Sequence, residues 1–401
     1  MLLFGIAGRF TDNKSRIVKH RDGRKEKKAG AVNKYPSDFE WIKRTYPFFN
    51  SDPLAYKRAI EETQRLRFRT EIDYLKKGAW LSQWEFVGPV NIGGRIVDIE
   101  FNPKYPDIVY AGAATGGVLK STDMGRTWRA VFDEQATLTI GDIAVDPNNP
   151  DIIYVGTGEA NGGHNNFPGG GIYKSLNGGN TWSYVGLDSS VSIGRVIIDP
   201  VNSNNIYVAA VGSYFAPNSQ RGVYKSTDGG QSWQRSLFVS DSTGAIDIIM
   251  DPVNPSFLMV AMWERVRRPS SAHLYGPSSG IYRSTDAGKS WSLLGSSTGL
   301  PNSLVQNVGR IGLAQSRTNP AIIYALYTDG YFVTGLYKTS DYGNSWSRMD
   351  PLNKITSGTS NFSWYFGQLR VHPVNPDIVY VMDVAFMRSS DGQYLADFIW
   401  I

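Results

Sequence analysis

The chain has no cysteine among its 401 residues, which excludes disulfide bonds, thiolate metal ligands and a cysteine nucleophile. It also has no apolar run that approaches the about 18 residues of a membrane-spanning helix. His164 and His273 lack the spacing to carboxylates that is typical of metal sites, and Gly169–Gly171 do not open a phosphate-binding helix. We therefore expect no metal, no cofactor and no membrane span.

Positive charge is scarce outside the beginning of the chain. Residues 1–83 contain 19 basic and 10 acidic residues, which leaves 22 basic and 26 acidic residues for the remainder. The net charge of +5 thus comes from a basic leader, while the rest of the chain is mildly acidic. Because a nucleic-acid-binding domain usually carries a basic patch, this distribution argues against nucleic acid as a partner.

One short sequence motif, which we call the repeated phrase, recurs along the chain. Five copies follow the pattern Ser/Thr-x-Asp/Asn-x-Gly-x-Ser/Thr-Trp, and a degenerate sixth copy begins at Ser389. The third position of the phrase is occupied by Asp123, Asn177, Asp228, Asp286 and Asp341. These positions are 54, 51, 58 and 55 residues apart, and such a period predicts one supersecondary unit that is stacked repeatedly.

Each repeat unit contains four short strand-like segments. In the second unit they cover residues 141–147, 151–155, 171–175 and 182–185, and Gly-rich and Pro-containing turns separate them. Four short strands in about 50 residues are typical of a propeller blade. The predicted fold class is therefore an all-β β-propeller of four-stranded blades, with six blades visible in a ring of six, seven or more.

The repeated phrase spans the turn between the third and fourth strands of each unit. Its carboxylate or carboxamide can accept backbone N–H groups of the turn, and its Gly permits the positive φ that such turns need. Asn177 keeps the acceptor without the charge. The pattern therefore favours a structural role for all five positions.

The chain divides into three regions. Residues 1–35 are expected to be a basic, disordered leader or a processed segment, in which apolar Met1–Gly8 suggests a signal-peptide remnant or a misassigned start. Residues 36–80 are expected to be a helical extension, with a helix over 53–77. The propeller is expected over 81–401. Residues 84–88 repeat the text of an outer strand, so we expect them to complete the sixth blade; the alternative is a truncated chain.

The repeated phrase resembles the Asp-box, or bacterial neuraminidase (BNR), repeat. The longer text is similar to the Asp-box propellers grouped with sortilin-type receptors and xyloglucanase-like glycosyl hydrolases, and most of all to secreted proteins of Bacteroidetes type. The segments that carry this likeness are Asn91–Arg95, Gly156–Asn161, Gly244–Asp247, Met262–Arg265 and Phe39–Pro47. The resemblance implies a bacterial protein that is secreted or on the cell surface; a cytoplasmic protein is the alternative if Met1 is the genuine start.

Two functions fit this resemblance. One is a glycan-directed hydrolase that cleaves O-glycosidic bonds, and the other is a non-catalytic, sortilin-like binder of protein, peptide or glycan ligands. The expected partner is a polysaccharide or a glycoprotein. The chain departs from sialidases, because Val97 follows Arg95 and Ile96 where sialidases have Pro. It holds at most one propeller, whereas xyloglucanase-like enzymes usually carry two, and it lacks the cysteine-rich module of sortilin.

Blade geometry predicts that chemistry lies on the face opposite the Asp boxes, where the long loops emerge. A glycosidase needs two carboxylates in different environments, so Glu159, Asp142 and Glu264 are the catalytic candidates. Candidate ligand contacts come from the same loops and from the channel: Arg95, His164, Arg195, Tyr214, Asp247, Trp263, Arg265 and Arg310.

The inner strands, when aligned, place charged residues around the central channel. The aligned position is occupied by Asp98, Asp142, Arg195, Asp247, Arg310 and Gln368. These side chains would either pair with one another around trapped water or hold a substrate carboxylate or hydroxyl on Arg195 and Arg310. The sequence does not distinguish between these two hypotheses.

Overall fold

The computed structural model describes residues 93–163, 166–268, 271–349, 360–389 and 395–399, with a few residues between 55 and 69. Contacts divide the chain into Met1–Pro36 and Ser37–Ile401, and all described residues belong to the second unit. Those between 55 and 69 are helical. The predicted boundaries at residues 35 and 80 and the predicted outer strand at 84–88 lie outside the described residues.

The strands form six four-stranded sheets, which we number as blades 1 to 6. Blade 1 contains β1 (Ile96–Phe101), β2 (Val109–Ala113), β3 (Gly117–Ser121) and β4 (Arg129–Ala130). Blade 2 contains β5 (Ile140–Val145), β6 (Ile153–Thr157), β7 (Ile172–Ser175) and β8 (Ser183–Tyr184). Blade 3 contains β9 (Ile193–Ile198), β10 (Ile206–Ala210), β11 (Gly222–Ser226) and β12 (Gln234–Leu237).

Blades 4 to 6 follow the same plan. Blade 4 contains β13 (Thr243–Met250), β14 (Leu258–Glu264), β17 (Gly280–Ser284) and β18 (Ser292–Leu294). Blade 5 contains β19 (Ile311–Gln315), β20 (Ile323–Thr328), β21 (Val333–Thr339) and β22 (Ser347–Arg348). Blade 6 contains β23 (Gln368–Val371), β24 (Val379–Met382), β25 (Phe386–Ser389) and β26 (Leu395–Ile399). The extra elements are β15 (Val266–Arg268), β16 (Ser271–His273), η1 (Asp188–Ser190), η2 (Ser296–Thr298) and α4 (Ser363–Phe366).

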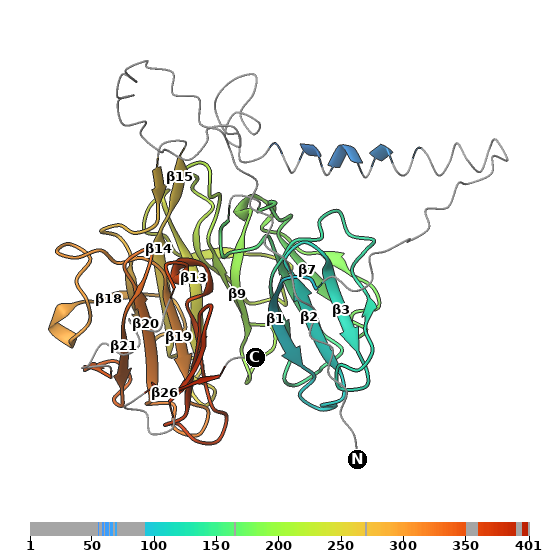
Figure 1. Ribbon diagram of the computed structural model, residues 1–401. Coiled ribbons are helices and arrows are strands. Elements are labelled where there is room, and N and C mark those ends of the chain that lie inside the picture. The colour runs from blue at the N-terminus through green and yellow to red at the C-terminus, as the bar shows by residue number, and fades with distance from the viewer. Residues whose placement is uncertain are drawn as a thin grey trace, which may run out of the picture. The chain divides into compact units, whose positions relative to one another are not determined.

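The blades are arranged as a propeller (Figure 1). Within each blade the strands are antiparallel and follow chain order, and β15–β16 form a separate hairpin inserted into blade 4. The innermost strand of each blade packs on that of the next blade, from β1 through β5, β9, β13 and β19 to β23. The prediction of an all-β propeller with four-stranded blades is confirmed, and the described residues contain six blades.

The sequence of each strand matches its depth in the blade. The second strands β2, β6 and β10 are buried along their whole length, because they have a strand on either side and lie within the stacked blades. Their sequences are accordingly continuous apolar runs, as in Ile206–Ala210. The outer strands β4, β8 and β22 are short and exposed. The core therefore lies between neighbouring blades, where Ile143 and Val155 of blade 2 join a cluster with Tyr110 and Val118 of blade 1.

The Asp-box turn is closed by its own side chains. In the first copy, Asp123 accepts hydrogen bonds from the backbone N–H of Thr127 (2.8 Å) and from its hydroxyl (2.6 Å). The Ser121 hydroxyl accepts the Gly125 N–H (2.8 Å). Two consecutive turn residues have positive φ, 60° at Met124 and 86° at Gly125, which explains the Gly. Asn177 accepts the Thr181 N–H at 2.8 Å, so the uncharged copy closes the same turn.

Neighbouring blades are joined by a repeated pair of donors, which we call the clasp. A Tyr on the second strand and a Lys on the third strand both donate to the carbonyl at the fourth position of the next Asp box. In blade 1 these are Tyr110 (3.0 Å) and Lys120 (2.7 Å), both bonded to the Gly178 carbonyl. The same pairs recur as Tyr154 and Lys174 on Gly229, and as Tyr207 and Lys225 on Ala287.

The prediction that residues 84–88 complete the sixth blade assumed that this blade has no fourth strand of its own, and this assumption is wrong. Blade 6 has its own fourth strand, β26, which pairs with β25 between Phe386 and Ile399. This strand was not predicted from the sequence, because β26 does not begin with the Trp that precedes the outer strands of the other blades. Among the residues that the structure describes, no helix is long and apolar enough to cross a membrane.

Candidate functional site

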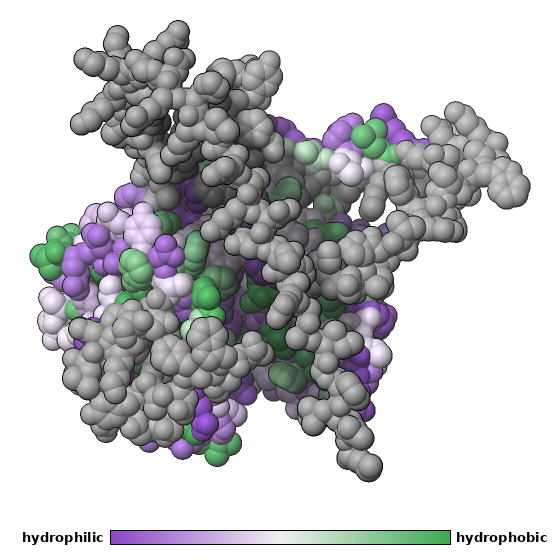
Figure 2. Space-filling model, in the orientation of Figure 1, coloured by the Kyte–Doolittle hydropathy of each residue, from purple (hydrophilic) through white to green (hydrophobic). Residues whose placement is uncertain are grey.

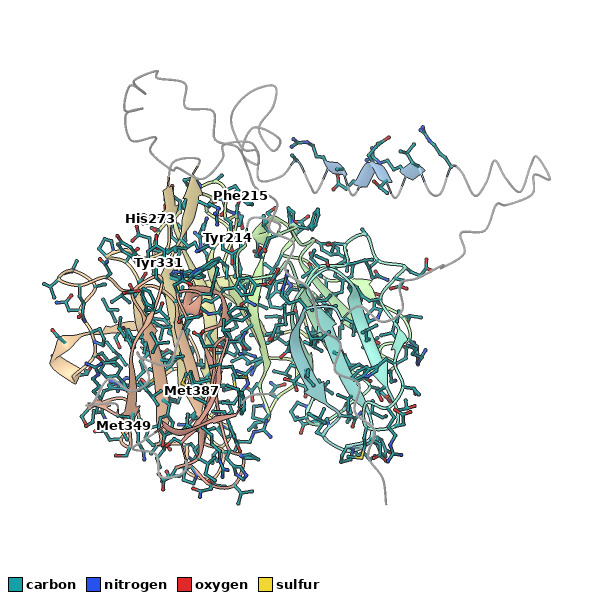
Figure 3. The ribbon with its side chains drawn as sticks, in the orientation of Figure 1. Tyr214, Phe215, His273, Tyr331, Met349 and Met387 are labelled. Carbon is teal, nitrogen blue, oxygen red and sulfur yellow. The ribbon has the colours of Figure 1, made fainter. Side chains whose placement is uncertain are left out.

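The loop-rich end of the propeller lies opposite the Asp boxes. Because each blade is an antiparallel meander, the loops between second and third strands emerge at the end away from the turns between third and fourth strands. Figure 3 shows Tyr214, Phe215, His273 and Tyr331 gathered toward the end that carries the β15–β16 hairpin. Tyr214, one of the predicted site residues, therefore lies at the loop-rich end.

Carboxylates on the inner strands link each blade to the next. Asp98 of blade 1 accepts the Ile143 N–H (3.0 Å), and Asp142 of blade 2 accepts the Val196 N–H (2.7 Å). Asp247 of blade 4 accepts the Leu313 N–H at 3.0 Å. These side chains have a structural task in the ring, which fits their burial.

The register of β19 corrects the predicted alignment around the channel. Ile143, Val196 and Leu313 occupy equivalent positions, since each donates its N–H to a carboxylate of an earlier blade. The blade 5 residue equivalent to Asp142 is therefore Gly312, and Arg310 stands two residues earlier, before the strand begins at Ile311. The alignment of the other five positions is consistent with the strand pairing.

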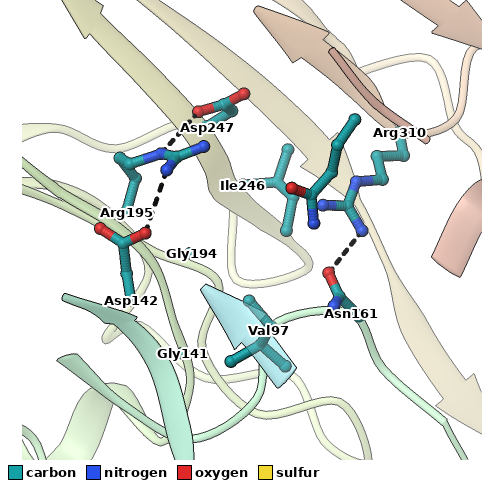
Figure 4. Close-up of a pocket in the computed structure, with 11 residues that line it drawn as sticks. Val97, Gly141, Asp142, Asn161, Gly194, Arg195, Ile246, Asp247 and Arg310 are labelled. Carbon is teal, nitrogen blue, oxygen red and sulfur yellow. Dashed lines mark hydrogen bonds and ion pairs between the residues drawn. The ribbon is translucent and has the colours of Figure 1, made fainter. Parts of the chain in front are cut away.

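A small polar pocket opens at the channel mouth, lined by the inner strands of blades 1 to 4 and 6 and by Arg310, which directly precedes the inner strand of blade 5 (Figure 4). Its lining includes Val97, Asp142, Arg195, Asp247, Arg310 and Gln368. Asn161, from the loop after β6, and Ala160 complete one side. Four of the predicted site residues thus come together in one place: Asp142, Arg195, Asp247 and Arg310.

Arg195 lies between two carboxylates. Its Nη1 is 3.1 Å from Asp142 and its Nε is 3.1 Å from Asp247. Burial opposes the charge on Arg195, but Asp142 and Asp247 outweigh it and raise the pKa of the guanidinium. Burial raises the pKa of Asp142 well above its usual range, in spite of Arg195, and the nearby Asp98 adds to the rise. The pocket therefore holds a carboxyl group whose charged form is opposed by burial.

Arg310 has a different environment from Arg195. Its Nη1 donates to the Asn161 side chain (2.7 Å) and to the Tyr365 carbonyl (2.8 Å), and its buried Nε has no hydrogen-bond partner. Burial lowers its pKa to about 10, which remains above physiological pH. Arg310 therefore brings a positive charge to the pocket that is held by neutral groups.

Glu159 is fully engaged at the rim of the pocket. Arg95 binds it in a bidentate manner, with Nε 3.0 Å from Oε1 and Nη2 2.5 Å from Oε2. The Tyr365 hydroxyl donates to Oε1 as well. The Glu159 side chain is 1% exposed, whereas that of Arg95 is 45% exposed. Of this pair, Arg95 is the member that can touch a ligand.

Glu264 stands apart from the pocket, at the end of β14. It accepts the Ser278 N–H (3.1 Å) and hydroxyl (2.6 Å), and it lies 3.0 Å from His273. Burial would raise the pKa of Glu264, but the hydrogen bonds from Ser278 and His273 outweigh it and lower the pKa. This carboxylate therefore holds the β15–β16 hairpin to the loop before β17.

Three predicted ligand contacts lie inside the molecule. Arg265 is 1% exposed and stacks against the rings of Tyr214 (5.1 Å), Trp263 (4.7 Å) and Trp364 (4.9 Å). Its Nη2 donates to the Gly162 carbonyl at 2.6 Å, which ties the loop of blade 2 to blade 4. Arg265, Tyr214 and Trp263 thus position the loops around the pocket. His164 lies outside the described residues.

The structure adds aromatic residues that sequence reasoning did not name. Tyr275, Phe362 and Phe366 are 36%, 50% and 38% exposed. With Tyr331 and Phe332, they come from the loops of blades 4 and 5 and from the connection to blade 6. Phe362 and Phe366 could have been found from the sequence, because residues 362–366 hold four aromatics within one connection between blades.

No group of three or more His, Asp or Glu side chains in the described part of the chain is arranged to hold a metal ion. The carboxylates, guanidinium groups and aromatic rings described above can supply proton transfer, charge stabilisation and aromatic stacking.

Comparisons with known proteins agree with this architecture. The BNR/Asp-box repeat family matches residues 224–235. A xyloglucanase of Hypocrea jecorina is 26% identical over 368 residues, which cover 79% of this chain and 40% of the relative. A xyloglucanase of a Paenibacillus species is 26% identical over 347 residues, which cover 77% of this chain and 31% of the relative. The chain thus spans two fifths or less of the length of these curated relatives.

Solved structures share the fold. A GH74 enzyme of Niastella koreensis matches with a TM-score of 0.53 and 21% identity over 74% of this chain and 45% of that one. The GH74 xyloglucanase of Xanthomonas campestris matches with a TM-score of 0.56 and 18% identity over 77% of this chain and 45% of that one. None of these comparisons supports the predicted likeness to sortilin-type receptors. The chain is a propeller with the BNR/Asp-box repeat, and it has homologues among the xyloglucanases.

Proposed function

We propose that this propeller hydrolyses O-glycosidic bonds of a polysaccharide at the channel mouth of its loop-rich end. The observation that carries the proposal is the pair Asp142 and Asp247, which flank Arg195 in one pocket. The xyloglucanase relatives support a polysaccharide as the substrate class. Such a substrate also supports the predicted location outside the cell, either secreted or on the surface.

The two carboxylates suit different tasks. Glycoside hydrolysis needs one carboxyl group that donates a proton to the leaving oxygen and one carboxylate that activates water or attacks the sugar. Asp142 is the candidate acid, because burial raises its pKa. Asp247 is the candidate base or nucleophile. It keeps contact with Arg195, which stabilises its charge.

Glu159 and Glu264 receive supporting roles in this proposal. Both carboxylates accept several hydrogen bonds, and neither is among the residues that line the pocket, whereas Asp142 and Asp247 are. Glu159 positions Arg95 at the rim, where the guanidinium can donate to sugar hydroxyls. Glu264 fixes the hairpin that borders the aromatic residues.

The exposed aromatics supply a binding surface for sugar rings. The flat faces of pyranose rings are apolar, and ring stacking on Tyr or Phe removes them from water. Tyr275, Tyr331, Phe332, Phe362 and Phe366 are exposed. Tyr275 lies beside Gly330, and the Ser363 N–H donates to the Tyr331 carbonyl, so the three segments that carry these rings are neighbours. His273 stacks on Tyr275 with ring centroids 6.2 Å apart, which holds that ring in place. A glycan chain that crosses these rings would reach Arg310 and Gln368 at the pocket.

The test is a kinetic comparison of Asp142→Asn and Asp247→Asn with the unsubstituted chain on a panel of polysaccharides that includes xyloglucan. Loss of either carboxyl group should lower kcat by about 100-fold or more, with KM little changed. Asp228→Asn, on the opposite end, is the matched control and should retain activity. Each variant is first checked by circular dichroism, because a broken buried ion pair can destabilise the fold.

Two outcomes would contradict the proposal. Unchanged hydrolysis in both folded variants would remove Asp142 and Asp247 from the mechanism. Glycan binding without any product from the unsubstituted chain would favour a non-catalytic binder instead.

A further inference from the structure

Three arginines at the loop-rich end are buried without a carboxylate beside them. Arg221, Arg265 and Arg310 are 0%, 1% and 6% exposed. Within the described ranges of the chain, none of the three forms an ion pair, in contrast to Arg95 and Arg195. A buried charge without an opposite charge is costly, so each of these guanidinium groups is a candidate for binding an anion.

Two of these arginines serve the folding of the loops. Arg221 donates to the carbonyls of Val211 (2.8 Å) and Arg265 (3.3 Å), and Arg265 donates to the Gly162 carbonyl (2.6 Å). Neither guanidinium is among the groups that line the pocket. Burial lowers the pKa of Arg265 to about 9, and the positive charge of Arg310 adds to the shift. Arg265 therefore stands close enough to Arg310 to add to the positive potential on that side of the pocket.

Arg310 is the member of this group that lines the pocket, and one of its nitrogens makes all of its hydrogen bonds. Nη1 donates to the Asn161 side chain (2.7 Å) and to the carbonyls of Tyr365 (2.8 Å) and Trp364 (3.5 Å). Among the residues that the structure describes, no acceptor receives a hydrogen bond from Nε or Nη2. Because Nε and Nη2 form one edge of the planar guanidinium, this edge has two unused donors.

The same edge of another arginine binds a carboxylate at the rim of the pocket. Arg95 donates from Nε (3.0 Å) and Nη2 (2.5 Å) to the two oxygens of Glu159. Two parallel N–H···O bonds from this edge match the planar shape of a carboxylate. Arg195, the other arginine of the pocket, is already occupied by Asp142 and Asp247. Arg310 is therefore the pocket arginine with the capacity to bind a carboxylate of a ligand.

Charge is divided between the two sides of the pocket. In Figure 4 Asp142, Arg195 and Asp247 lie on one side, and Arg310 and Asn161 lie on the other. Both carboxyl groups that line the pocket belong to the first side, whereas Arg310 contacts only neutral groups. An anionic group is therefore attracted to the Arg310 side of the pocket.

We propose that Arg310 binds the carboxylate of a uronic acid residue, so that the pocket favours acidic polysaccharides. This inference rests on the proposed function, because it assigns the acidic sugar to the same site. A neutral polysaccharide such as xyloglucan can still enter the site, but it lacks this contact. A carboxylate on the free edge of Arg310 accepts two charge-assisted hydrogen bonds, which corresponds to about 10-fold or more in affinity over an uncharged group in its place.

The test is a binding titration with oligogalacturonate and oligoglucuronate, each compared with its methyl ester. The ester keeps the sugar chain and removes the charge. The parent chain should bind at least one of the acids about 10-fold or more tightly than its ester. Arg310→Gln should bind acid and ester equally. Arg310→Lys keeps the charge without the two-donor edge, so it should retain only part of the preference. Circular dichroism confirms that each variant is folded.

A control variant separates the pocket from general attraction to the surface. The chain has a net charge of +5, and hydrophilic residues are scattered among hydrophobic ones on the face shown in Figure 2, so an acidic glycan can also bind weakly elsewhere. Arg126, which is exposed in the first Asp box, offers the matched substitution. Arg126→Gln loses the same charge as Arg310→Gln and should keep the full preference for the acid.

Three outcomes would overturn the proposal: equal binding of acid and ester by the parent chain, no binding of either acid, or an unchanged preference in folded Arg310→Gln. Hydrolysis is measured separately, by analysis of the products. A preference for the acid without any product would contradict the proposed hydrolysis and leave the carboxylate site in place. Hydrolysis of neutral xyloglucan without a preference for the acid would do the reverse.

Discussion

Single carboxylates in this propeller have opposite protonation tendencies that follow from their surroundings. Asp228 is exposed and accepts hydrogen bonds from Ser232 and Ser226, which lower its pKa to about 2. Asp142 is buried beside other carboxylates, which raises its pKa. The same residue type therefore closes a turn as an anion at one end of the molecule and can hold a proton at the other.

The first residue-scale prediction concerns Asp142 as the acid. Its protonated form is the active one, so the rate of hydrolysis should fall as pH rises through its raised pKa. Asp142→Asn should flatten that alkaline limb of the pH–rate profile. Its folded pKa also exceeds the unfolded value, so its stabilising contribution is present below about pH 3.9 and is lost as pH rises through the folded pKa. A profile whose alkaline limb is unchanged in the variant would assign the acid role to another group.

The second concerns the Asp box. The depressed pKa of Asp228 means that its contribution to stability is present above about pH 3.9 and is lost as pH falls toward about 2. Asp228→Asn should lower the melting temperature slightly at pH 7, since Asn177 shows that a carboxamide closes the turn. The difference between variant and parent should shrink from pH 5 to pH 2. A difference that is independent of pH would contradict this account of the turn.

At the scale of the element, blade 2 shares a hydrophobic cluster with blade 1. A matched pair of substitutions measures the contribution of this cluster. Ile143→Ala removes a side chain buried against blade 1 and should cost about 2–5 kcal/mol of unfolding free energy. Ile99→Ala removes the equivalent exposed side chain and should change the unfolding free energy by at most about 0.5 kcal/mol. Denaturant unfolding of both variants gives the comparison, and equal losses would show that Ile99 is buried in solution.

Elements were predictable where the signal is local. The spacing of Asp123, Asn177 and the other box residues gave the blades, because strand, turn and strand follow within one period. β26 was missed because Leu395–Ile399 lacks the Trp of the other outer strands. Arg310 was placed two residues out of register, because nothing local shows that its strand begins at Ile311. The burial of Arg265 is not predictable from local sequence, because the rings of Tyr214 and Trp364 that cover it come from loops far apart in the chain.

At the scale of the whole molecule, the two ends of the propeller have different roles. The end with the Asp boxes repeats one turn and one clasp, and its residues stabilise the ring. The loops of the other end do not repeat, and there Asp142, Arg195, Asp247 and Arg310 meet in one pocket. The repeated motif therefore identifies the fold, and the residues that vary between blades carry the proposed activity.

The central claim is that the carboxylates at the channel mouth cleave a polysaccharide. The most direct measurement is the release of new reducing ends and oligosaccharide products from xyloglucan by the 401-residue chain, beside the folded double variant Asp142→Asn/Asp247→Asn. The account predicts products from the parent chain and none above background from the double variant. Equal product release by both proteins would contradict it.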